Sequence, residues 1–472
     1  MTPDTGHRLR NQYVCLAIIT IAAALLRLFR LTAHGLTLDE GYSAHLGQTS
    51  TAGFIATVWN SEFNMVLYYA LLRIWMHIGH SEFVIRLLGV LFAVATVPAI
   101  YFLARRLFHD EWTPLLAAML LAIHSFHIAL SQDARSYSLV VLVVTLASLY
   151  FLRLLQCPSR VNCASYALMC AAAGYSHFFA LLVVPGQAAA LVFFPKGPPW
   201  KYLLIALVVT IVLLLPLASF LLRHGDAGHV SWVTPLNRQQ VADVLYSLTL
   251  SRRRSLAYIA LWIAGLFAAI SSARENAWPY RFTAIWLFLP LLITLLISMG
   301  RPFFVARFLA ICIPAAVLLA ASGVVVISRW SRCASLAILT LTVFYSASNI
   351  RHYFQRPEYT ETWREASAYL LSRAQPGDEV VVLPGTRPPF DYYLERNSRS
   401  LPQLRILQSG ADALNISPPR NVWFIGSLTL TPKLANETEA FAQAHRRGQY
   451  CPEPPQPASG SVQVWQFRMC AK

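Results

Sequence analysis

Two adjacent carboxylates, Asp39 and Glu40, lie in the stretch "GLTLDEGYSAHLGQ", directly after the first long apolar run of the chain. Acidic residues are scarce in this region, since only 11 of the chain's 22 fall within residues 1–350. A carboxylate at a boundary between water and lipid can be partly desolvated, which increases its basicity and suits it to general-base catalysis. The simpler interpretation is that Asp39 and Glu40 cap or solvate a short helix beginning near Gly41, because Asp before a helix is an ordinary N-cap.

Three arginines, Arg135, Arg301 and Arg307, occur in the segments "SQDARSYS" and "GRPFFVAR" between apolar runs. Guanidinium groups match phosphate oxygens with paired N–H donors, so these arginines are candidate ligands for a phosphate at headgroup depth. The alternative is that they extend to ordinary lipid headgroups. The run from Arg252 to Arg254 can equally be a general anchor for anionic lipids.

Aromatic side chains and one histidine accompany these candidates. Tyr68, Tyr69, Tyr137 and His177 are candidate residues of a substrate groove. An aromatic belt at the membrane interface explains the tyrosines nearly as well. A single boundary histidine is usually structural, stacked on a ring or hydrogen-bonded, so this second interpretation stays open for His177.

The composition sets the class of protein that must position these residues. The chain is 56% hydrophobic and only 13% charged, and the apolar residues form long blocks. Runs of about 17–25 mostly apolar residues match a hydrocarbon core about 30 Å thick. The sequence therefore predicts a polytopic α-helical membrane protein with about eleven spans, at residues 13–31, 83–104, 113–130, 136–154, 163–178, 180–195, 201–222, 256–272, 282–299, 307–328 and 333–348.

The orientation follows from the basic residues of the short turns. If residues 1–12 are cytoplasmic, each inner turn carries a basic pair, such as Arg105 and Arg106, as the positive-inside rule expects. The outer loops are basic as well, so this bias is weak. The first span starts like a signal peptide, but its apolar residues continue to Leu31, and we expect Arg27 and Arg30 to anchor its outer end.

An odd number of spans places the end of the chain outside the cytoplasm. We expect a multi-spanning domain at residues 1–349, with an outer catalytic loop at 32–82, and an extracytoplasmic α/β domain at 350–472. In this tail, "TETWREASAYLLSRA" has helical period, with Trp363, Ala366, Tyr369 and Leu370 on one face. The segments "DEVVVLPG", "NVWFIGS" and "SVQVWQF" indicate short strands.

Cysteines and acidic residues give little sign of a metal site. Cys451 and Cys470 both fall in the tail, where an oxidising compartment allows a disulfide, and their pairing stays open. Asp39 and Glu40 alone make a poor site for a hard cation, since adjacent side chains rarely converge and six oxygen ligands are wanted. Asp133 can join them only if two outer loops meet. We predict no metal or other cofactor, with a divalent cation as the alternative.

Several segments resemble a known family in order and spacing. The strings "LTLDEGYSAHLG", "NMVLYYALLRIWMHIGHSEFVIRLLGVLF" and "SQDARSYSLVVLV" are similar to those of the GT-C-type membrane glycosyltransferases of the family 39-like group, which are related to protein O-mannosyltransferases and bacterial aminoarabinose transferases. Farther along, "YSHFFALLVVPGQA", "RPFFVARFLAICIPA" and "TWREASAYLLSRAQPGDEVVVL" also resemble bacterial members. Many relatives have Pro where Val66 stands, a departure that concerns the local helix geometry.

This resemblance implies a glycosyltransferase that moves a sugar from a polyprenyl-phosphate donor to an acceptor at the outer face of a bacterial plasma membrane. It maps the catalytic base onto Asp39, and it implies that residues 41–80 lie along the membrane surface. The lipid phosphate is already a good leaving group, so one base suffices and a single displacement inverts the anomeric carbon. Glu40 then orients the loop or the acceptor. The expected partners are the lipid-linked sugar, membrane lipids and an unidentified acceptor, and no nucleic acid.

Two other classes of protein are the alternatives. An ion-coupled transporter or flippase usually has ionisable residues inside its spans, whereas the 11 acidic residues of the membrane part fall in predicted turns, loops or span ends. A non-enzymatic membrane sensor could use the tail as its binding module. That interpretation leaves the acidic pair and the outer arginines without a role, so the glycosyltransferase is favoured.

Overall fold

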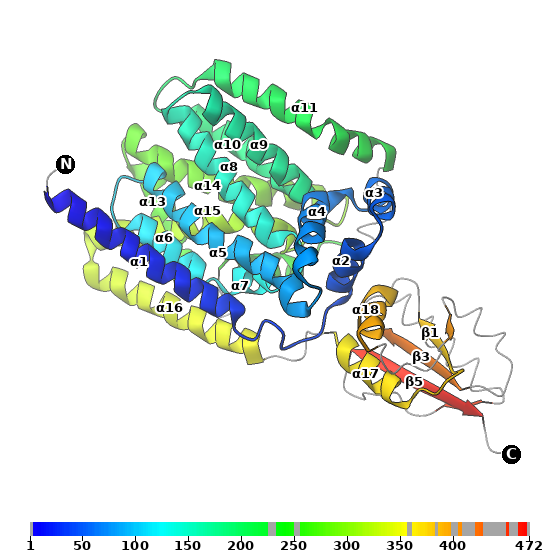
Figure 1. The fold of residues 1–472 in the computed structure, drawn as a ribbon. Coiled ribbons are helices and arrows are strands. Elements are labelled where there is room, and N and C mark those ends of the chain that lie inside the picture. The colour runs from blue at the N-terminus through cyan, green and yellow to red at the C-terminus, as the bar shows by residue number, and fades with distance from the viewer. Residues whose placement is uncertain are drawn as a thin grey trace. The chain divides into compact units, whose positions relative to one another are not determined.

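The computed structural model describes residues 3–224, 233–249, 255–355, 361–382, 386–397, 405–407, 421–427, 450–452 and 461–469. The chain forms two compact units (Figure 1). The first comprises Met1–Phe29, Thr51–Leu72 and Arg86–Gln355. The second comprises Arg30–Ser50, Arg73–Ile85 and Arg356–Lys472, so two segments of the predicted outer loop group with the C-terminal residues.

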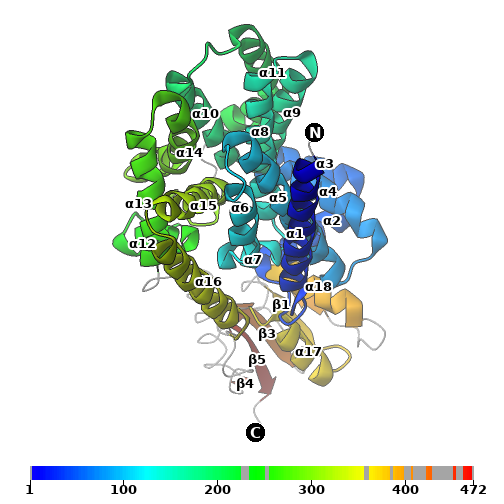
Figure 2. The ribbon, with the colours of Figure 1, turned by 90° about the vertical axis from the view of Figure 1, so that its left-hand side faces the viewer.

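The first unit is built from helices, two of which extend into the second unit with residues 73–75 and 82–85. They are α1 (Pro3–Leu28), α3 (Thr51–Asn60), η1 (Phe63–Met65), α4 (Val66–Trp75), α5 (Glu82–Leu107), α6 (Thr113–Ala122), α7 (Ser125–Ser131), α8 (Tyr137–Gln156), α9 (Arg160–Ser176), η3 (Phe178–Leu182), α10 (Val183–Ala190), η4 (Leu191–Phe193), α11 (Trp200–His224), α12 (Arg238–Leu248), α13 (Leu256–Ser271), α14 (Arg274–Ser298), η5 (Phe308–Cys312), α15 (Ile313–Trp330) and α16 (Arg332–Gln355). Helices α8, α9 and α11 lie side by side in that order (Figure 1). In Figure 2, α15 lies between α6 and α13.

Seven helices in the described part of the chain are long and apolar enough to cross a membrane, or eight if α6 and α7 form one bent span. Each of the eleven predicted segments coincides with helical structure, which confirms a multi-spanning helical protein. The segments 163–178, 180–195 and 256–272 correspond to shorter helices, so the number of eleven stays a prediction. The span ending at Trp330 is 89% buried, whereas the spans of α1 and α16 are mostly exposed, as expected of helices facing lipid.

The segment between residues 41 and 80 contains no long helix. Helices α2, α3 and α4 have 11, 10 and 10 residues, too few to cross a hydrocarbon core. Val66 is the first residue of α4. Its φ of −55° is one that Pro also adopts, but its N–H donates to the Phe63 carbonyl, a bond that Pro at this position could not make.

The sequence suggested that Arg27 anchors the outer end of the first span to lipid, and the structure contradicts this prediction. Its side chain is 0% exposed, and its guanidinium donates to the carbonyls of Leu121 and Ala122 at 3.1 and 3.0 Å and contacts His127 Nδ1 at 2.9 Å. These carbonyls end α6, where the helix dipole favours a cation. Arg27 thus donates to both carbonyls at the 57° bend between α6 and α7, and the Leu121 carbonyl also accepts the His124 N–H at 3.3 Å.

The second unit combines helices with a five-stranded sheet. Its elements are α2 (Leu38–Gln48), η2 (Met76–Ile78), α17 (Trp363–Arg373), β1 (Glu379–Val382), α18 (Arg387–Asn397), β2 (Arg405–Leu407), β3 (Val422–Ser427), β4 (Tyr450–Pro452) and β5 (Val462–Met469). The strand order is β2-β1-β3-β5-β4, with β1 parallel to both neighbours and β5 antiparallel to both of its own. The three predicted strands are β1, β3 and β5, which confirms a small α/β fold.

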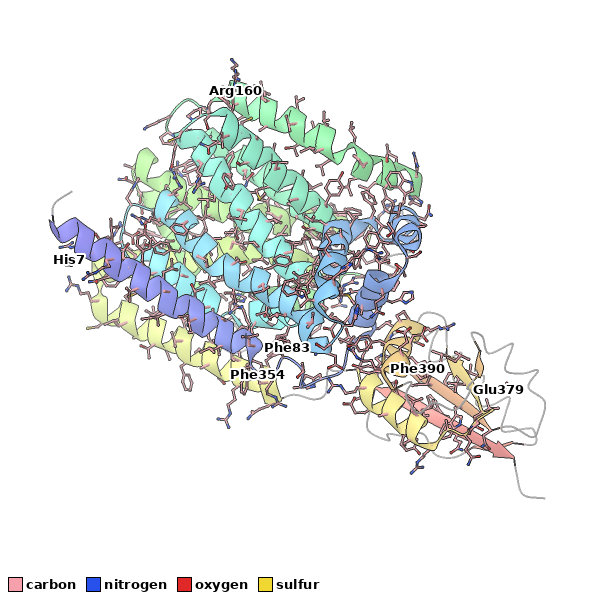
Figure 3. All side chains as sticks on the ribbon, viewed as in Figure 1. His7, Phe83, Arg160, Phe354, Glu379 and Phe390 are labelled. Atoms are coloured by element: carbon pink, nitrogen blue, oxygen red, sulfur yellow. The ribbon has the colours of Figure 1, made fainter. Side chains whose placement is uncertain are left out.

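Two helices complete the core of the second unit. On α17, Trp363, Ala366 and Leu370 are fully buried and Tyr369 is half-buried, so the predicted apolar face is confirmed. This helix packs against β5 and α18. Figure 3 marks Phe390 on α18, which is also fully buried.

Candidate active site

The first turn of α2 carries both carboxylates of the proposed catalytic pair. The helix begins at Leu38, and the hydroxyl of its N-cap, Thr37, accepts the Glu40 N–H at 3.3 Å. Glu40 Oε2 in turn accepts the Thr37 N–H at 3.0 Å, which completes a capping box. The interpretation of Asp39 as the cap of a helix beginning near Gly41 is therefore wrong, because the helix begins earlier and Thr37 caps it.

The two neighbouring carboxylates have different surroundings. Glu40 is 1% exposed and its side chain is bonded to the backbone, which is the geometry of a residue that holds the turn. Asp39 is half-buried at the second helical position, and the capping box does not use it. The amino end of a helix favours a negative charge nearby, so both carboxylates suit this turn.

In the first unit, Arg135 and two tyrosines of α4 form one group. Arg135 donates to the Tyr69 hydroxyl at 3.1 Å, and the rings of Tyr68 and Tyr69 are 6.2 Å apart. Both tyrosines are buried. Arg135 lies in the tight turn between α7 and α8, and Gly89 of α5 allows close packing there, since a Cβ at Gly89 would lie 2.9 Å from the Ser131 carbonyl oxygen.

Arg307 and His177 belong to a second, aromatic group in the same unit. The guanidinium carbon of Arg307 lies 5.9 Å from the Tyr137 ring centroid and 6.0 Å from that of Phe308. The His177 ring centroid lies 6.0 Å from Tyr137 and 5.0 Å from Phe308. Tyr137 connects these residues, because its ring lies near both Arg307 and His177 and Arg135 precedes it by two positions, so the structure brings the three predicted residues into one cluster.

His177 has one ring nitrogen that is engaged and one that is not. The residue is 2% exposed, and its Nδ1 accepts the Phe179 N–H at 3.3 Å. In the neutral ring the proton is then on Nε2. This Nε2 is buried without a hydrogen-bond partner among the described residues. A buried donor beside two guanidinium groups has the chemistry of an anion site.

Other predicted residues lie apart from this cluster or outside the described part of the chain. Arg301 is exposed in the turn that follows α14. The run from Arg252 to Arg254 and Cys470 lie outside the described residues. Among the described residues, no group of three or more His, Cys, Asp and Glu side chains could hold a metal ion.

Sequence reasoning missed the residues that hold the α2 segment. Arg364 pairs with Glu82 and donates to the His34 carbonyl at 2.8 Å. The Tyr393 hydroxyl donates to Glu82 at 2.6 Å and accepts the Leu36 N–H at 2.6 Å. These contacts join residues about 280 to 360 positions apart, so no local pattern could have indicated them.

The chain resembles known proteins in one family segment and in its whole fold. Residues 65–220 match the family described as dolichyl-phosphate-mannose-protein mannosyltransferase. A comparison of the sequence with curated proteins finds no match. ArnT from Cupriavidus metallidurans bound to undecaprenyl phosphate is similar in structure, with a TM-score of 0.64 at 10% identity, over 95% of this chain and 97% of that one.

Two further structures have the same fold with larger chains. The archaeal oligosaccharyltransferase AglB from Archaeoglobus fulgidus, in complex with an inhibitory peptide and a dolichol-phosphate, has a TM-score of 0.54 at 12% identity, over 97% of this chain and 74% of that one. The arabinofuranosyltransferase AftD from Mycobacteria has a TM-score of 0.53 at 13% identity, over 98% of this chain and 41% of that one. The chain therefore has a multi-spanning helical fold of the GT-C type, and residues 65–220 are similar to the dolichyl-phosphate-mannose-protein mannosyltransferase family.

Proposed function

We propose that this protein transfers a sugar from a polyprenyl-phosphate donor to an acceptor at the outer face of the membrane. The observation that carries the proposal is the cluster of Arg135, Arg307 and His177 in the helical unit. It offers two permanent cations and one neutral donor among buried aromatic rings. Two proteins of the same fold are described with undecaprenyl phosphate and with a dolichol-phosphate, which supports a lipid phosphate as its ligand.

The cluster suits a phosphate that becomes more negative during the reaction. A donor phosphodiester carries one negative charge, and the departing lipid phosphate gains a second one as the glycosidic bond breaks. Donors positioned for that second charge stabilise the transition state more than the ground state, which raises kcat. We assign this role to Arg135 and Arg307, with His177, Tyr68, Tyr69 and Tyr137 around the phosphate and the sugar. Arg301 is exposed in the turn after α14, so we expect it to contribute less to phosphate binding than Arg135 and Arg307.

Asp39 is the proposed general base. It takes the proton of the acceptor hydroxyl while that oxygen attacks the anomeric carbon from the side opposite the leaving phosphate, so the configuration inverts. Glu40 keeps the first turn of α2 in place through its bond to Thr37. The residues 1–349 would then form the transferase domain and 350–472 the extracytoplasmic domain, with the active face outside a bacterial plasma membrane.

The test is transfer by the purified, full-length protein in lipid nanodiscs. Undecaprenyl-phosphate-linked hexoses and pentoses serve as donors, and a bacterial envelope extract supplies the acceptor hydroxyls. Mass spectrometry measures the released undecaprenyl phosphate and the glycosylated product. We expect release with at least one donor, and loss of release in Asp39→Asn. Equal release by the wild type and by Asp39→Asn would contradict the assignment of the base. A wild type that binds no donor lipid would contradict the function itself.

A further inference from the structure

Glu361 lies directly before α17, and its side chain reaches the first turn of α2. Its Oε2 accepts the N–H of Leu38 at 2.7 Å and the indole N–H of Trp363 at 2.6 Å. Leu38 is the first residue of α2, so its N–H has no partner within the helix. The capping box pairs the N–H groups of Thr37 and Glu40, and Glu361 accepts the remaining N–H of Leu38.

Other C-terminal side chains fix the residues that precede this turn. Arg364 donates to the Thr32 and His34 carbonyls at 3.1 and 2.8 Å, and Tyr393 accepts the Leu36 N–H. Within the helix, Gly41 packs so closely on α18 that a Cβ there would lie 2.7 Å from the Pro389 backbone. The segment from 32 to 41 is therefore shaped by contacts with the C-terminal part of the same unit.

Glu361 also adds a third negative group beside Asp39 and Glu40. Burial raises the pKa of the Glu361 carboxyl, the bonds from Trp363 and Leu38 lower it, and the charges of Asp39 and Glu40 raise it. Coulomb interactions are reciprocal, so an ionised Glu361 makes a neighbouring carboxylate hold its proton more strongly. Other charged or titratable groups lie around this segment on α17, α5, α18 and α2, namely Arg364, Glu82, Tyr393, Arg387, Asp391 and His45.

We propose that Glu361 is a positioning residue for Asp39: it holds the first turn of α2 through the Leu38 N–H and places a further carboxylate beside Asp39. This inference rests on the proposed function, because it assumes that Asp39 accepts the proton. If Glu361 acts in this way, the C-terminal residues affect the reaction by positioning α2, in addition to any role in choosing the acceptor.

Two substitutions separate the hydrogen bonds of Glu361 from its charge. In Glu361→Gln, the amide oxygen accepts the same two N–H groups, and the charge is lost. In Glu361→Ala, both the acceptor and the charge are lost. Glu365→Gln is the matched control, because Glu365 is exposed on the first turn of α17.

The first measurement is the pH dependence of kcat/KM for the full-length protein in nanodiscs, with the undecaprenyl-phosphate-linked sugar that the wild type uses. Activity should rise with pH as the base ionises. Removal of a neighbouring negative charge eases that ionisation, so Glu361→Gln should shift the acidic limb to lower pH by about 0.5–1 unit. The plateau rate should fall several-fold because the base is weaker. An unshifted limb in Glu361→Gln would overturn the role of the charge.

The second measurement is hydrogen exchange of the amides in residues 36–41, which needs no substrate. These amides should exchange at least several-fold faster in Glu361→Ala and at the wild-type rate in Glu361→Gln and Glu365→Gln. Unchanged exchange in Glu361→Ala would overturn the role of Glu361 in holding the turn.

The two proposals can fail separately. If Asp39→Asn transfers sugar at the wild-type rate, Asp39 is not the base, and the tuning of its basicity by Glu361 fails with it. If Asp39→Asn is inactive but Glu361→Gln keeps the wild-type pH profile and plateau, the inference on Glu361 alone is wrong. A shifted limb together with an inactive Asp39→Asn supports both.

Discussion

At the scale of single residues, the adjacent carboxylates Asp39 and Glu40 illustrate what the local sequence can indicate. The spacing of Thr37 and Glu40 is that of a capping box, so the helix start was readable from the sequence. The alternative in which Asp39 and Glu40 cap the helix is right for Glu40, which is part of the capping box, and wrong for Asp39. The bond from Leu38 to Glu361 had no such signal, because it joins residues more than 300 positions apart.

The substitution Asp39→Asn removes the proton acceptor and keeps the size of the side chain. Transfer should fall by about 10²–10⁴-fold. Stability should change by no more than about 1 kcal/mol, because Asp39 acts on the helix through its dipole and not as its cap. Glu40→Gln should lose less activity, since Gln also closes a capping box. Transfer rates and unfolding temperatures check both expectations. Asp243→Asn, an exposed substitution on α12, is the control and should change neither quantity.

The arginine cluster gives a second prediction at this scale. Arg135→Ala and Arg307→Ala should each raise the donor KM and lower kcat, because the leaving phosphate gains charge in the transition state. A charge-assisted hydrogen bond contributes about 1.5–3 kcal/mol and more when desolvated, so the loss in kcat/KM should be several-fold to about a thousand-fold. Arg301→Ala should have a smaller effect, and the exposed Arg332→Ala none. Unchanged kinetics in both cluster variants would make these residues headgroup anchors.

At the scale of elements, hydropathy predicted the apolar helical segments well, but their number as membrane spans stays a prediction, and it could not indicate the contacts between them. Each predicted span coincides with helical structure, because a run of apolar residues is a local property. Arg27 is different, since its place in the first span suggested a lipid anchor. The bend between α6 and α7 supplies carbonyl partners that only the folded helices bring within reach.

The substitution Arg27→Met tests this view of the bent span. Met keeps most of the apolar stem but removes every donor, so the Ala122 carbonyl loses its bond from Arg27, whereas the Leu121 carbonyl keeps the His124 N–H at 3.3 Å. A buried acceptor without a partner costs about 1–3 kcal/mol, and the protein should unfold at a lower temperature in detergent. Arg10→Met, an exposed change on the same helix, should leave the unfolding temperature unchanged. Equal unfolding temperatures of Arg27→Met and Arg10→Met would show that Arg27 does not stabilise the bend.

The packing of α2 on α18 gives another test at this scale. Alanine has the higher helix propensity, so Gly41→Ala would stabilise α2 in isolation. In the protein, the added Cβ would lie 2.7 Å from the Pro389 backbone, which must shift. We expect a loss of transfer and faster exchange of the α2 amides. Gly197→Ala, with no atom within 4 Å of the added Cβ, is the control that should behave like the wild type.

At the scale of the whole molecule, the parity of the spans decides on which side the C-terminal unit lies. If all seven long apolar helices of the described residues cross the membrane, the two ends of the chain lie on opposite sides, and adding the bent pair alone would put them on the same side. The predicted eleven again give opposite sides. The GT-C fold, shared with ArnT over 95% of this chain, shows the architecture but not the orientation.

Reporter fusions on either side of α16 test the orientation and the proposed outer active face together. This helix runs from Arg332 to Gln355, so fusions after Ser331 and after Gln355 report its two ends. Alkaline phosphatase, which is active only outside the cytoplasm, should work after Gln355 and not after Ser331, and a fluorescent protein that matures in the cytoplasm should show the reverse. The reason is that the basic pair of Arg329 and Arg332 favours a cytoplasmic turn.

Phosphatase activity at neither or both positions would mean that α16 does not cross the membrane. Activity after Ser331 alone would place the C-terminal unit, and Asp39 with it, in the cytoplasm, and the acceptor would then have to be a cytoplasmic molecule.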